Sequence, residues 1–498
     1  MKRPFKSSFA GAALLGWFFA TIMMTCGGVI HAQTASETRQ PWRYLLLNDS
    51  YLVDDCPVCG RPSIREPLRG AFELRLTEIN PLFSRYAIVN LNLTAGSVRS
   101  YTLKGNGTFQ IGGEVALVQQ MELELEINDG ASTRVCHLKN PSPAVTGRWP
   151  MINLTLEQTD GTLTQTYTLH LAAAPLREIW FSTALGFTAG LGEPGPVSGG
   201  DFLSSAGRVV HRSFQFCGAL SPMPPCPDLG LDATDLLPGG EIAFSITQDI
   251  FSERLGPLRQ GDVLSSRGRI LHRQEELLAA FAPATPAVDA GLDALHMPDT
   301  GEVWFSIGSE VVSKTLKVTL HRGDLLSSTG EVVRSYQQLL SRFHPPAGSG
   351  DYGLDALYVW PGGEIWFSTE KGFQDQVLGP VQGGDLLSDQ GYIVFRNLEL
   401  LNTFAPLEDV AEFGLDALYI VTDATTPPQA PRLEITARPS TGSISLEWEG
   451  NGRVFQVERS DDPVTPFGPV SPILPALAFE DSGVMNSRSR AFYRLRQW

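Results

Sequence analysis

Two sets of aspartates recur at fixed spacing through the middle of this chain. One set stands in the phrase Gly-Leu-Asp-Ala, at Asp232, Asp293, Asp355 and Asp416. The other set stands in the phrase Gly-Asp, 31 residues earlier in every repeat, at Asp201, Asp262, Asp324 and Asp385. If the repeats form a closed ring, four equivalent carboxylates share one radius and height and could hold a cation such as Ca²⁺, which prefers oxygen ligands. Aspartates also cap turns through backbone N–H groups; that interpretation is favoured for both sets, and more strongly for the Gly-Asp aspartates, with the cation as the alternative for the Gly-Leu-Asp aspartates.

A second group of residues that could do chemistry begins with Cys56 and Cys59, which are separated by two residues. Two thiolates at this spacing can bind one face of a tetrahedral zinc ion, and Cys136 could supply a third of the four ligands that a zinc site needs. In an exported protein such cysteines more commonly form disulfides, and a redox-active pair is a third alternative. Cys217 and Cys226 flank a proline-rich loop, which predicts a local disulfide.

The elements that position the aspartates are indicated by a third repeated phrase, Glu-Ile-Trp-Phe-Ser in its fullest form. It recurs about every 62 residues, with its glutamate at Glu178, Glu241, Glu302 and Glu364. Each unit contains four short apolar segments separated by turns and ends in one helical turn. Tandem units of four strands are typical of a β-propeller. The tryptophans of this phrase have apolar neighbours, so we expect them to pack between blades.

The phase of the repeat indicates how the ring closes. The first unit begins with the Glu178 phrase and has no Leu-Asp-Ala strand before it, whereas the last such strand, at 415–421, has no Glu-Ile-Trp-Phe phrase after it. If these two strands pair, the chain makes four complete blades without exposed sheet edges. The segment 166–172 is an alternative inner strand for the first blade, and an open solenoid is the alternative architecture.

The regions on either side of the repeats also have the patterns of strands. Residues 40–175 alternate apolar and polar residues, which predicts a β-sandwich or barrel. Residues 423–431 form a predicted proline-rich linker, and residues 432–498 again have the pattern of strands. We therefore predict an all-β protein with an N-terminal β-sandwich or barrel, a four-bladed β-propeller over 176–422 and a small C-terminal β-sandwich.

The repeats resemble the hemopexin family of four-bladed propellers, because each inner strand begins with Asp-Ala and follows an apolar segment that ends in phenylalanine. The resemblance covers about residues 178–421. It implies a central tunnel that holds a cation or an anion near the starts of the inner strands. It also implies a role in binding proteins and ligands rather than in catalysis. Residues 432–498 resemble a fibronectin type III module, which implies a spacer or an adhesive unit.

Residues 1–32 have the pattern of a signal peptide. Lys2, Arg3 and Lys6 precede a long apolar run, and Ala32 offers a cleavage site before Gln33. An uncleaved anchor is the alternative, because the run is long; no other membrane span is predicted. We expect a secreted, periplasmic or cell-surface protein. Removal of three positive charges takes the net charge from −16 to −19, which argues against nucleic-acid binding.

The motifs favour a non-enzymatic binding or scaffold protein of the cell envelope over an enzyme. The chain carries no Gly-x-Ser-x-Gly elbow, no His-Glu-x-x-His motif and no P-loop. We expect a monomer that binds an extracellular protein or a glycan. The alternative is an exported propeller hydrolase acting on a polysaccharide or a lactone. That activity would need acidic residues of single blades, such as Asp235, Asp249 and Glu310, to meet at one mouth of the tunnel.

Overall fold

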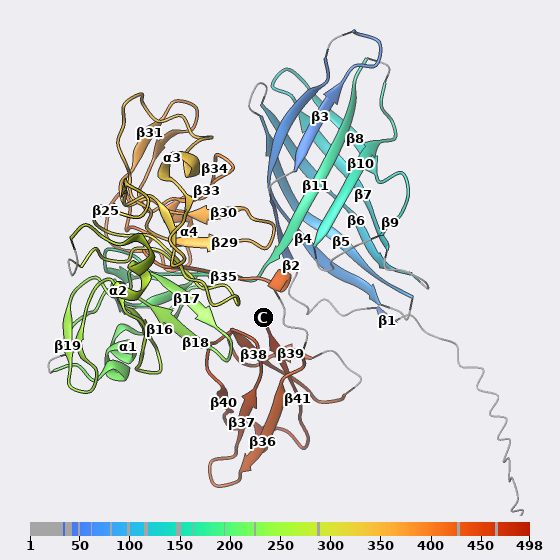
Figure 1. Cartoon of the computed structure of the whole chain (residues 1–498). Helices are drawn as coiled ribbons and strands as arrows, with labels where there is room; N and C mark the ends of the chain where they lie inside the picture. The colour runs from blue at the N-terminus through green and yellow to red at the C-terminus, as the bar shows by residue number, and fades with distance from the viewer. Residues whose placement is uncertain are drawn as a thin grey trace, which may run out of the picture.

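The structure is a computed structural model, and it describes residues 33–34, 42–47, 50–60, 62–79, 82–96, 100–113, 118–145, 151–162, 164–193, 195–223, 226–285, 289–425, 429–463 and 467–498. The predicted signal peptide at 1–32 lies outside these residues. Within them, no helix combines the length and the apolar character needed to cross a lipid bilayer. Figure 1 shows three parts in chain order: an elongated barrel, a propeller and a small pair of C-terminal sheets.

The first part is a closed antiparallel barrel rather than a sandwich. Its strands are β2 (Trp42–Leu46), β3 (Tyr51–Asp55), β4 (Ile64–Ile79), β5 (Phe83–Ala95), β6 (Tyr101–Gly112), β7 (Val118–Asn128), β8 (Thr133–Lys139), β10 (Ile152–Gln158) and β11 (Thr166–Leu176). Strands β2 and β3 share the position between β11 and β4, and β4 pairs with β5, so the sheet closes on itself. The short strands β1 (Gln33–Thr34) and β9 (Ala144–Val145) pair with β4 and β7.

Alternation along the barrel strands explains the closed, filled interior. In β7 the apolar side chains at every second position from Met121 to Ile127 are buried, while the glutamates between them are exposed. Successive side chains of a strand point to opposite faces of the sheet, so one face meets its counterparts across the barrel. The interior is a continuous cluster of leucine, isoleucine, phenylalanine and tyrosine side chains.

The second part is a four-bladed propeller in which each blade is a four-stranded sheet. From the axis outwards, the first two blades consist of β35 (Leu418–Val421), β12 (Glu178–Phe181), β15 (Phe202–Ser204) and β16 (Arg208–His211), and of β17 (Thr234–Leu237), β18 (Glu241–Phe244), β21 (Val263–Ser265) and β22 (Ile270–His272). The other two consist of β23 (Leu295–His296), β24 (Trp304–Phe305), β27 (Leu325–Ser327) and β28 (Val332–Arg334), and of β29 (Leu357–Val359), β30 (Ile365–Phe367), β33 (Leu386–Ser388) and β34 (Tyr392–Phe395).

The ring closes through the last inner strand of the chain, as predicted. Strand β35 pairs antiparallel with β12, with Glu178 opposite Val421 and Phe181 opposite Leu418. The alternative inner strand at 166–172 is wrong, because those residues belong to β11 of the barrel. Closure gives the first blade an inner strand from the end of the repeat region, so all four blades have four strands, which explains why the repeat is out of phase with the blades.

Each blade carries two additions to its four strands. One is a hairpin between its second and third strands: β13 (Phe187–Ala189) with β14 (Gly195–Val197), β19 (Ile250–Ser252) with β20 (Gly256–Leu258), β25 (Val311–Ser313) with β26 (Val318–Leu320), and β31 (Phe373–Asp375) with β32 (Gly379–Val381). The other is a short helix after the fourth strand: α1 (Ser213–Leu220), α2 (Gln274–Leu277) with η1 (Ala279–Phe281), α3 (Tyr336–Leu339) and α4 (Asn397–Leu400). The helices match the predicted helical turns; the hairpins were not predicted.

The third part consists of two small three-stranded sheets. One contains β36 (Arg432–Arg438), β37 (Ser443–Glu449) and β40 (Ala478–Asp481), and the other contains β38 (Phe455–Ser460), β39 (Gly468–Pro469) and β41 (Phe492–Gln497), with α5 (Val484–Ser487) after β40. Trp448 and Phe455 lie in their shared apolar core. The predicted all-β architecture is therefore confirmed in its three parts.

One buried carboxylate joins the three parts. Asp423 lies in η2 (Asp423–Thr425), directly after the last propeller strand. It accepts hydrogen bonds from Nε of Arg177 at 2.6 Å and from Nε1 of Trp498 at 2.7 Å, and it forms an ion pair with Arg496. Arg177 directly follows the last barrel strand, while Trp498 and Arg496 belong to the C-terminal part, so this residue fixes their relative positions.

Candidate functional site

The candidate site lies where the four inner strands β35, β17, β23 and β29 begin around the propeller axis. A serine ends the Glu-Ile-Trp-Phe-Ser phrase of each blade, and its hydroxyl donates to the leucine carbonyl of the next Gly-Leu-Asp phrase. These bonds run from Ser182 to Leu231 (2.7 Å), Ser245 to Leu292 (2.8 Å), Ser306 to Leu354 (2.9 Å) and Ser368 to Leu415 (2.7 Å). The serine therefore recurs because it fixes the backbone just before each Gly-Leu-Asp aspartate.

The four Gly-Leu-Asp carboxyl groups converge on the axis. Asp293 and Asp416, which come from opposite blades, keep only 8% and 6% of their surface exposed. Burial raises the pKa of Asp416, and the charge of Asp293 across the axis raises it further, to about 7. Burial likewise holds the pKa of Asp355 well above its usual range, and the charges of all three other carboxyl groups add to the effect. Each group thus senses the others.

Most of these carboxyl groups have no hydrogen-bond partner. In the described part of the chain, the side chains of Asp232, Asp355 and Asp416 neither accept a hydrogen bond nor form an ion pair. They are therefore not turn caps. Burial, reinforced by the neighbouring carboxylates, raises the pKa of Asp232 to about 8 and that of Asp293 to about 9. Asp293 and Asp416 are buried, Asp232 and Asp355 are partly exposed, and Arg322 lowers the pKa of Asp293. Low exposure and neighbouring carboxyl groups both disfavour the ionised state of these acids.

The rim of the site is not four-fold symmetric, because Glu370 belongs to one blade alone. It is hydrogen-bonded to Asp293 and forms an ion pair with Arg322. Burial raises the pKa of Glu370, and Arg322 opposes that rise. The other repeats place Ala184, Thr247 and Gly308 at the equivalent position. Sequence reasoning missed this residue, although the position two residues after the repeated serine is where the four units differ in chemistry.

The donor chemistry of the site suits a hard cation, while the side-chain positions suit protonated carboxyl groups. Ca²⁺ takes oxygen ligands, and four carboxyl groups supply them. Among the residues that the structure describes, however, no three His, Cys, Asp or Glu side chains stand in the geometry of a metal site. A cation would need the carboxyl groups to turn inward as their protons leave.

The Gly-Asp aspartates have the opposite surroundings, as the turn interpretation predicts. One oxygen of each accepts the backbone N–H three residues earlier, at 2.9–3.1 Å, from Ser198, Arg259, His321 and Gln382. The other accepts the first N–H of the following helix, at 2.8–3.2 Å, from Ser213, Gln274, Tyr336 and Asn397. In three blades an arginine pairs with the same carboxylate: Arg212, Arg273 and Arg396.

The other end of the tunnel is covered by the C-terminal part. Asp235 on β17 lies there, 3.3 Å from Nδ1 of His296 on β23. Arg453 approaches from the C-terminal sheets: its Nη1 donates to the Leu236 carbonyl and lies 3.6 Å from Asp235, and its Nη2 donates to Asp299 at 2.8 Å. This arginine neutralises Asp235, so the two ends of the tunnel differ in charge balance.

The acidic residues of single blades considered for catalysis do not meet. Asp235 is paired as described above. Asp249 accepts the backbone N–H of Gln260 at 3.1 Å, and Glu310 pairs with His321 at 2.8 Å. Each of the three therefore has its own partner. This separation removes the convergence that the predicted hydrolase would need from them.

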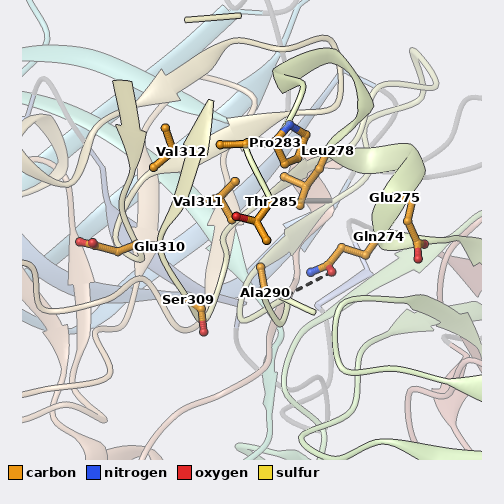
Figure 2. A pocket seen from close by; sticks show the side chains of 11 residues that line it. Gln274, Glu275, Leu278, Pro283, Thr285, Ala290, Ser309, Glu310, Val311 and Val312 are labelled. Atoms are coloured by element: carbon orange, nitrogen blue, oxygen red, sulfur yellow. Dashed lines mark hydrogen bonds between the residues drawn. The ribbon is translucent and has the colours of Figure 1, made fainter. Parts of the chain in front are cut away.

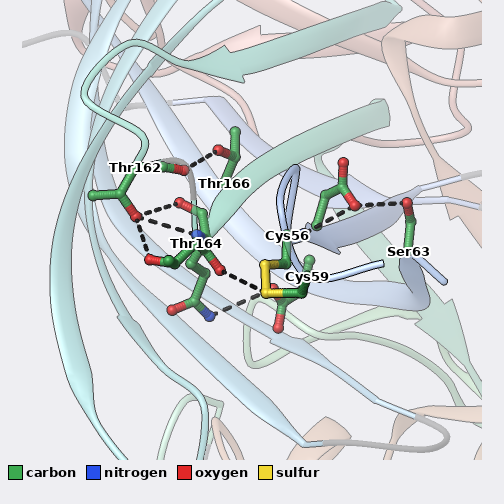
Figure 3. The surroundings of a disulfide bond; sticks show 9 residues. Cys56, Cys59, Ser63, Thr162, Thr164 and Thr166 are labelled. Atoms are coloured by element: carbon green, nitrogen blue, oxygen red, sulfur yellow. Dashed lines mark hydrogen bonds between the residues drawn. A yellow bond between two sulfur atoms is a disulfide. The ribbon is translucent and has the colours of Figure 1, made fainter. Parts of the chain in front are cut away.

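The cysteines form two disulfides, and the disulfide prediction is confirmed. Cys56 bonds to Cys59 and Cys217 bonds to Cys226. Figure 3 shows the first of these beside Thr164, whose carbonyl lies 4.0 Å from the Cys59 sulfur. Cys136 is free and buried in the barrel, and burial raises the pKa of its thiol to about 11. The zinc grouping of Cys56, Cys59 and Cys136 is not formed, because the first two thiols are bonded to each other.

A mostly apolar cavity of about 340 Å³ lies between the second and third blades (Figure 2). Leu278, Pro283 and Val311 form part of its wall. One of its polar side chains, Gln274, accepts a hydrogen bond from the backbone N–H of Ala290 at 3.1 Å. The cavity therefore offers apolar surface and few free polar groups.

Comparisons with known proteins do not assign the chain to a family. No family model matches it, and no curated protein sequence matches it. Two solved structures that share some likeness are extracellular domains of hybrid two-component systems from B. thetaiotaomicron. One has 8% identity and a TM-score of 0.19, covering 84% of this chain and 75% of the other; the second has 9% identity and a TM-score of 0.20, covering 92% and 98%. TM-scores this low do not establish a common fold, and nothing below rests on them.

Proposed function

We propose that this protein is an exported, non-enzymatic binding protein of the cell envelope, and that the tunnel of its propeller holds a cation at the Gly-Leu-Asp aspartates. The observation that carries the proposal is the lack of hydrogen-bond partners for Asp232, Asp355 and Asp416. Buried polar groups are almost always hydrogen-bonded, and buried charges are almost always paired. Asp416 is buried and Asp232 and Asp355 are partly exposed. Three such acids without partners at one point support binding of a partner from solution.

The raised pKa values define what that partner replaces. In the absence of a cation, protonation of the carboxyl groups reduces the electrostatic repulsion among the four of them. A divalent cation offers the same neutralisation with stronger electrostatic attraction, and Ca²⁺ is the candidate because it accepts many oxygen ligands in flexible geometry. Binding would release protons, since the ligands must be deprotonated. A bound ion would also lock the four blades together at the axis.

Export is part of the proposal. The signal-peptide pattern at 1–32 and the two disulfides fit an oxidising compartment outside the cytosol. The proposed partners are an extracellular protein or a glycan, bound by a monomer. The strongly acidic composition argues against nucleic acid as the ligand.

Elemental analysis of the mature protein tests the tunnel cation. The protein is purified without chelator or added metal, and Ca and Zn are counted per chain. The proposal predicts about one Ca per chain, lost in the quadruple variant with asparagine at Asp232, Asp293, Asp355 and Asp416. A single Asp249→Asn variant is the control, because Asp249 lies outside the tunnel group. No Ca after dialysis against millimolar Ca²⁺ would overturn the tunnel cation, and Zn lost on Cys56→Ser would revive the cysteine site.

The hydrolase alternative now depends on Asp293 and Glu370, the carboxyl pair at the rim. Two carboxyl groups that act on a glycosidic bond flank the sugar and stand about 5 Å or more apart. Asp293 and Glu370 are hydrogen-bonded to each other, which leaves no room for a sugar between them. Hydrolysis of a polysaccharide or a lactone by the parent protein that is lost in Glu370→Gln, with unchanged Ca content, would favour the hydrolase alternative.

A further inference from the structure

A cleft of about 460 Å³ lies between the outside of the barrel and the fourth blade. Its floor is the outward face of three adjacent strands, β2, β4 and β5. Its other wall is β34, the outermost strand of the blade, which pairs on one side only, with β33. Figure 1 shows the blade and the barrel facing each other here. Ligand sites occur preferentially at such boundaries between folded units.

The floor carries polar side chains because strand alternation turns their apolar neighbours inward. Arg69 on β4 lies opposite Thr94 on β5, and Ala71 lies opposite Asn92. Leu68 and Leu93, the intervening residues, are buried in the barrel core. The polar groups thus gather on one outward patch, joined by Arg43 on β2.

The two arginines of the cleft stack on aromatic rings and do not pair with carboxylates of the described residues. The guanidinium carbon of Arg69 lies 4.1 Å from the centre of the Tyr392 ring, and that of Arg43 lies 5.5 Å from the centre of the Phe395 ring. Within the described residues neither forms an ion pair, and Nε of Arg69 is buried without a hydrogen-bond partner. Nη1 of Arg69 donates to the Leu68 carbonyl at 2.8 Å. Stacking fixes the orientation of a guanidinium group and leaves its remaining N–H groups available to a ligand.

The acidic residue of the cleft is held away from these arginines. Glu73 lies opposite Arg43 on the neighbouring strand, yet its carboxylate accepts a hydrogen bond from Nδ2 of Asn90 at 2.9 Å. Asn90 adopts a φ of 53° at a bulge in β5, a conformation that costs energy for a residue other than glycine. Strained backbone of this kind clusters at functional sites.

We propose that this cleft binds an acidic sugar unit of a glycan, with its carboxylate on Arg69. Arg43, which lies opposite Glu73 and four residues further along the floor, extends the basic surface of the cleft. Guanidinium groups bind carboxylates through charge-assisted, paired hydrogen bonds. The Asn92 amide and the Thr94 hydroxyl, for which the described residues supply no hydrogen-bond partner, match the hydroxyl groups of the sugar. The volume is within the range of small-ligand sites. The inference rests on the proposed role as a binding protein and is independent of the tunnel cation.

Calorimetry with the mature full-length protein tests the cleft, with a uronic-acid oligosaccharide as the probe and its neutral counterpart and inorganic phosphate as comparisons. We expect Arg69→Gln to weaken binding of the acidic oligosaccharide at least tenfold and Arg43→Gln to weaken it less, with the neutral oligosaccharide bound far more weakly than the acidic one. Arg75→Gln is the matched control, because Arg75 is an exposed arginine on the same strand outside the cleft. An Asn92→Ala variant is expected to lower the affinity for the acidic oligosaccharide several-fold. It provides a second test if an arginine variant fails to fold.

Each other outcome has one meaning. Acidic-oligosaccharide binding that survives both arginine substitutions would overturn the cleft and leave the proposed binding role intact. Equal binding of acidic and neutral oligosaccharides would overturn the carboxylate contact. Binding of phosphate alone would overturn the sugar assignment. Lack of any glycan binding in a protein that retains about one Ca per chain would overturn the cleft inference only, whereas loss of both would overturn the proposed function as well.

Discussion

The Gly-Asp and the Gly-Leu-Asp aspartates share a residue type and a repeat, yet their surroundings are opposite. Each Gly-Asp carboxylate accepts two backbone N–H groups, and three of the four also pair with an arginine. Three of the Gly-Leu-Asp carboxyl groups accept nothing in the described structure, and burial raises their pKa values. The Gly-Asp carboxylates therefore stabilise the fold through bonds within the chain. The Gly-Leu-Asp carboxyl groups still have oxygen atoms available to bind a ligand.

This contrast separates structural from functional repetition. A repeated residue with all its partners supplied by the chain is explained by folding alone. A repeated residue without them costs stability in each blade. Its recurrence in all four blades is explained when one ligand meets all four, which the geometry of a closed ring allows.

The largest expected difference is between Asp385→Ala and Asp416→Ala. Loss of the Asp385 carboxylate leaves two backbone N–H groups and Arg396 without their partner, so we expect the free energy of unfolding to fall by about 3 kcal/mol. Asp416→Ala removes a carboxyl group without partners whose pKa is raised by folding, so in chelator at pH 7 the free energy of unfolding should not fall and is expected to rise. Urea unfolding of both variants measures the difference. Equal losses would show that the Gly-Leu-Asp aspartate is structural after all.

The pH dependence of stability should separate the two sets next. A carboxyl group whose pKa is higher in the folded than in the unfolded state contributes stability that is fully present below the unfolded value, near 4, and is lost as pH rises toward the folded value. With Asp416 at about 7, Asp232 at about 8 and Asp293 at about 9, the loss runs from about pH 4 to about pH 9. Its slope is at most about 1.4 kcal/mol per pH unit for each group.

Unfolding in chelator at a series of pH values checks this. The quadruple asparagine variant should lose most of the slope between pH 5 and 9. If the free energy of unfolding of the variant had the same pH slope as that of the parent, titratable groups other than the Gly-Leu-Asp aspartates would cause the pH dependence.

Calcium should stabilise the parent through the Gly-Leu-Asp set alone. A ligand that binds only the folded state at a hundred times its dissociation constant adds about 2.7 kcal/mol. Thermal unfolding with and without millimolar Ca²⁺ should therefore show a shift in Tm for the parent and none for the quadruple variant. Asp249→Asn is the control that should keep the shift. A shift retained by the quadruple variant would contradict the tunnel assignment.

The smallest expected effect concerns Glu370, the residue that makes the rim of the site asymmetric. Glu370 raises the pKa of Asp293 both by its charge and by their hydrogen bond, whereas Asp416 responds to Asp293 and to its own burial. Glu370→Gln should therefore lower the pKa of Asp293 and leave that of Asp416 nearly unchanged. Carbon NMR of the aspartate carboxyl groups follows both. Equal shifts would mean that the ring titrates as one unit.

Repetition explains which features were predictable from the sequence. The strands at the positions of Glu178 and Asp416, and the closure that joins them, follow from shared phrases and their phase. The Gly-Asp turns follow from the chemistry of aspartate before a strand. The choice between sandwich and barrel could not be made, because alternation along β7 is the same in both.

The remaining features depend on residues that occur once. No other repeat has a charged residue at the position of Glu370. Arg453 reaches the far end of the tunnel only because η2 and Asp423 position the C-terminal sheets there. The arginines of the cleft, Arg43 and Arg69, come to line one cleft only through the pairing of β2 with β4. Local sequence patterns do not predict such contacts, because they form between residues that are distant in the sequence and that only the tertiary structure brings together.

The most direct test of the tunnel assignment is calorimetric titration of the chelated protein with Ca²⁺ at pH 7 in two buffers of different protonation enthalpy. This experiment counts ions and protons together. The account predicts one Ca²⁺ bound per chain with release of at least one proton, and neither in the quadruple asparagine variant. Binding without proton release, or binding retained by that variant, would contradict the claim that the Gly-Leu-Asp aspartates exchange protons for a cation.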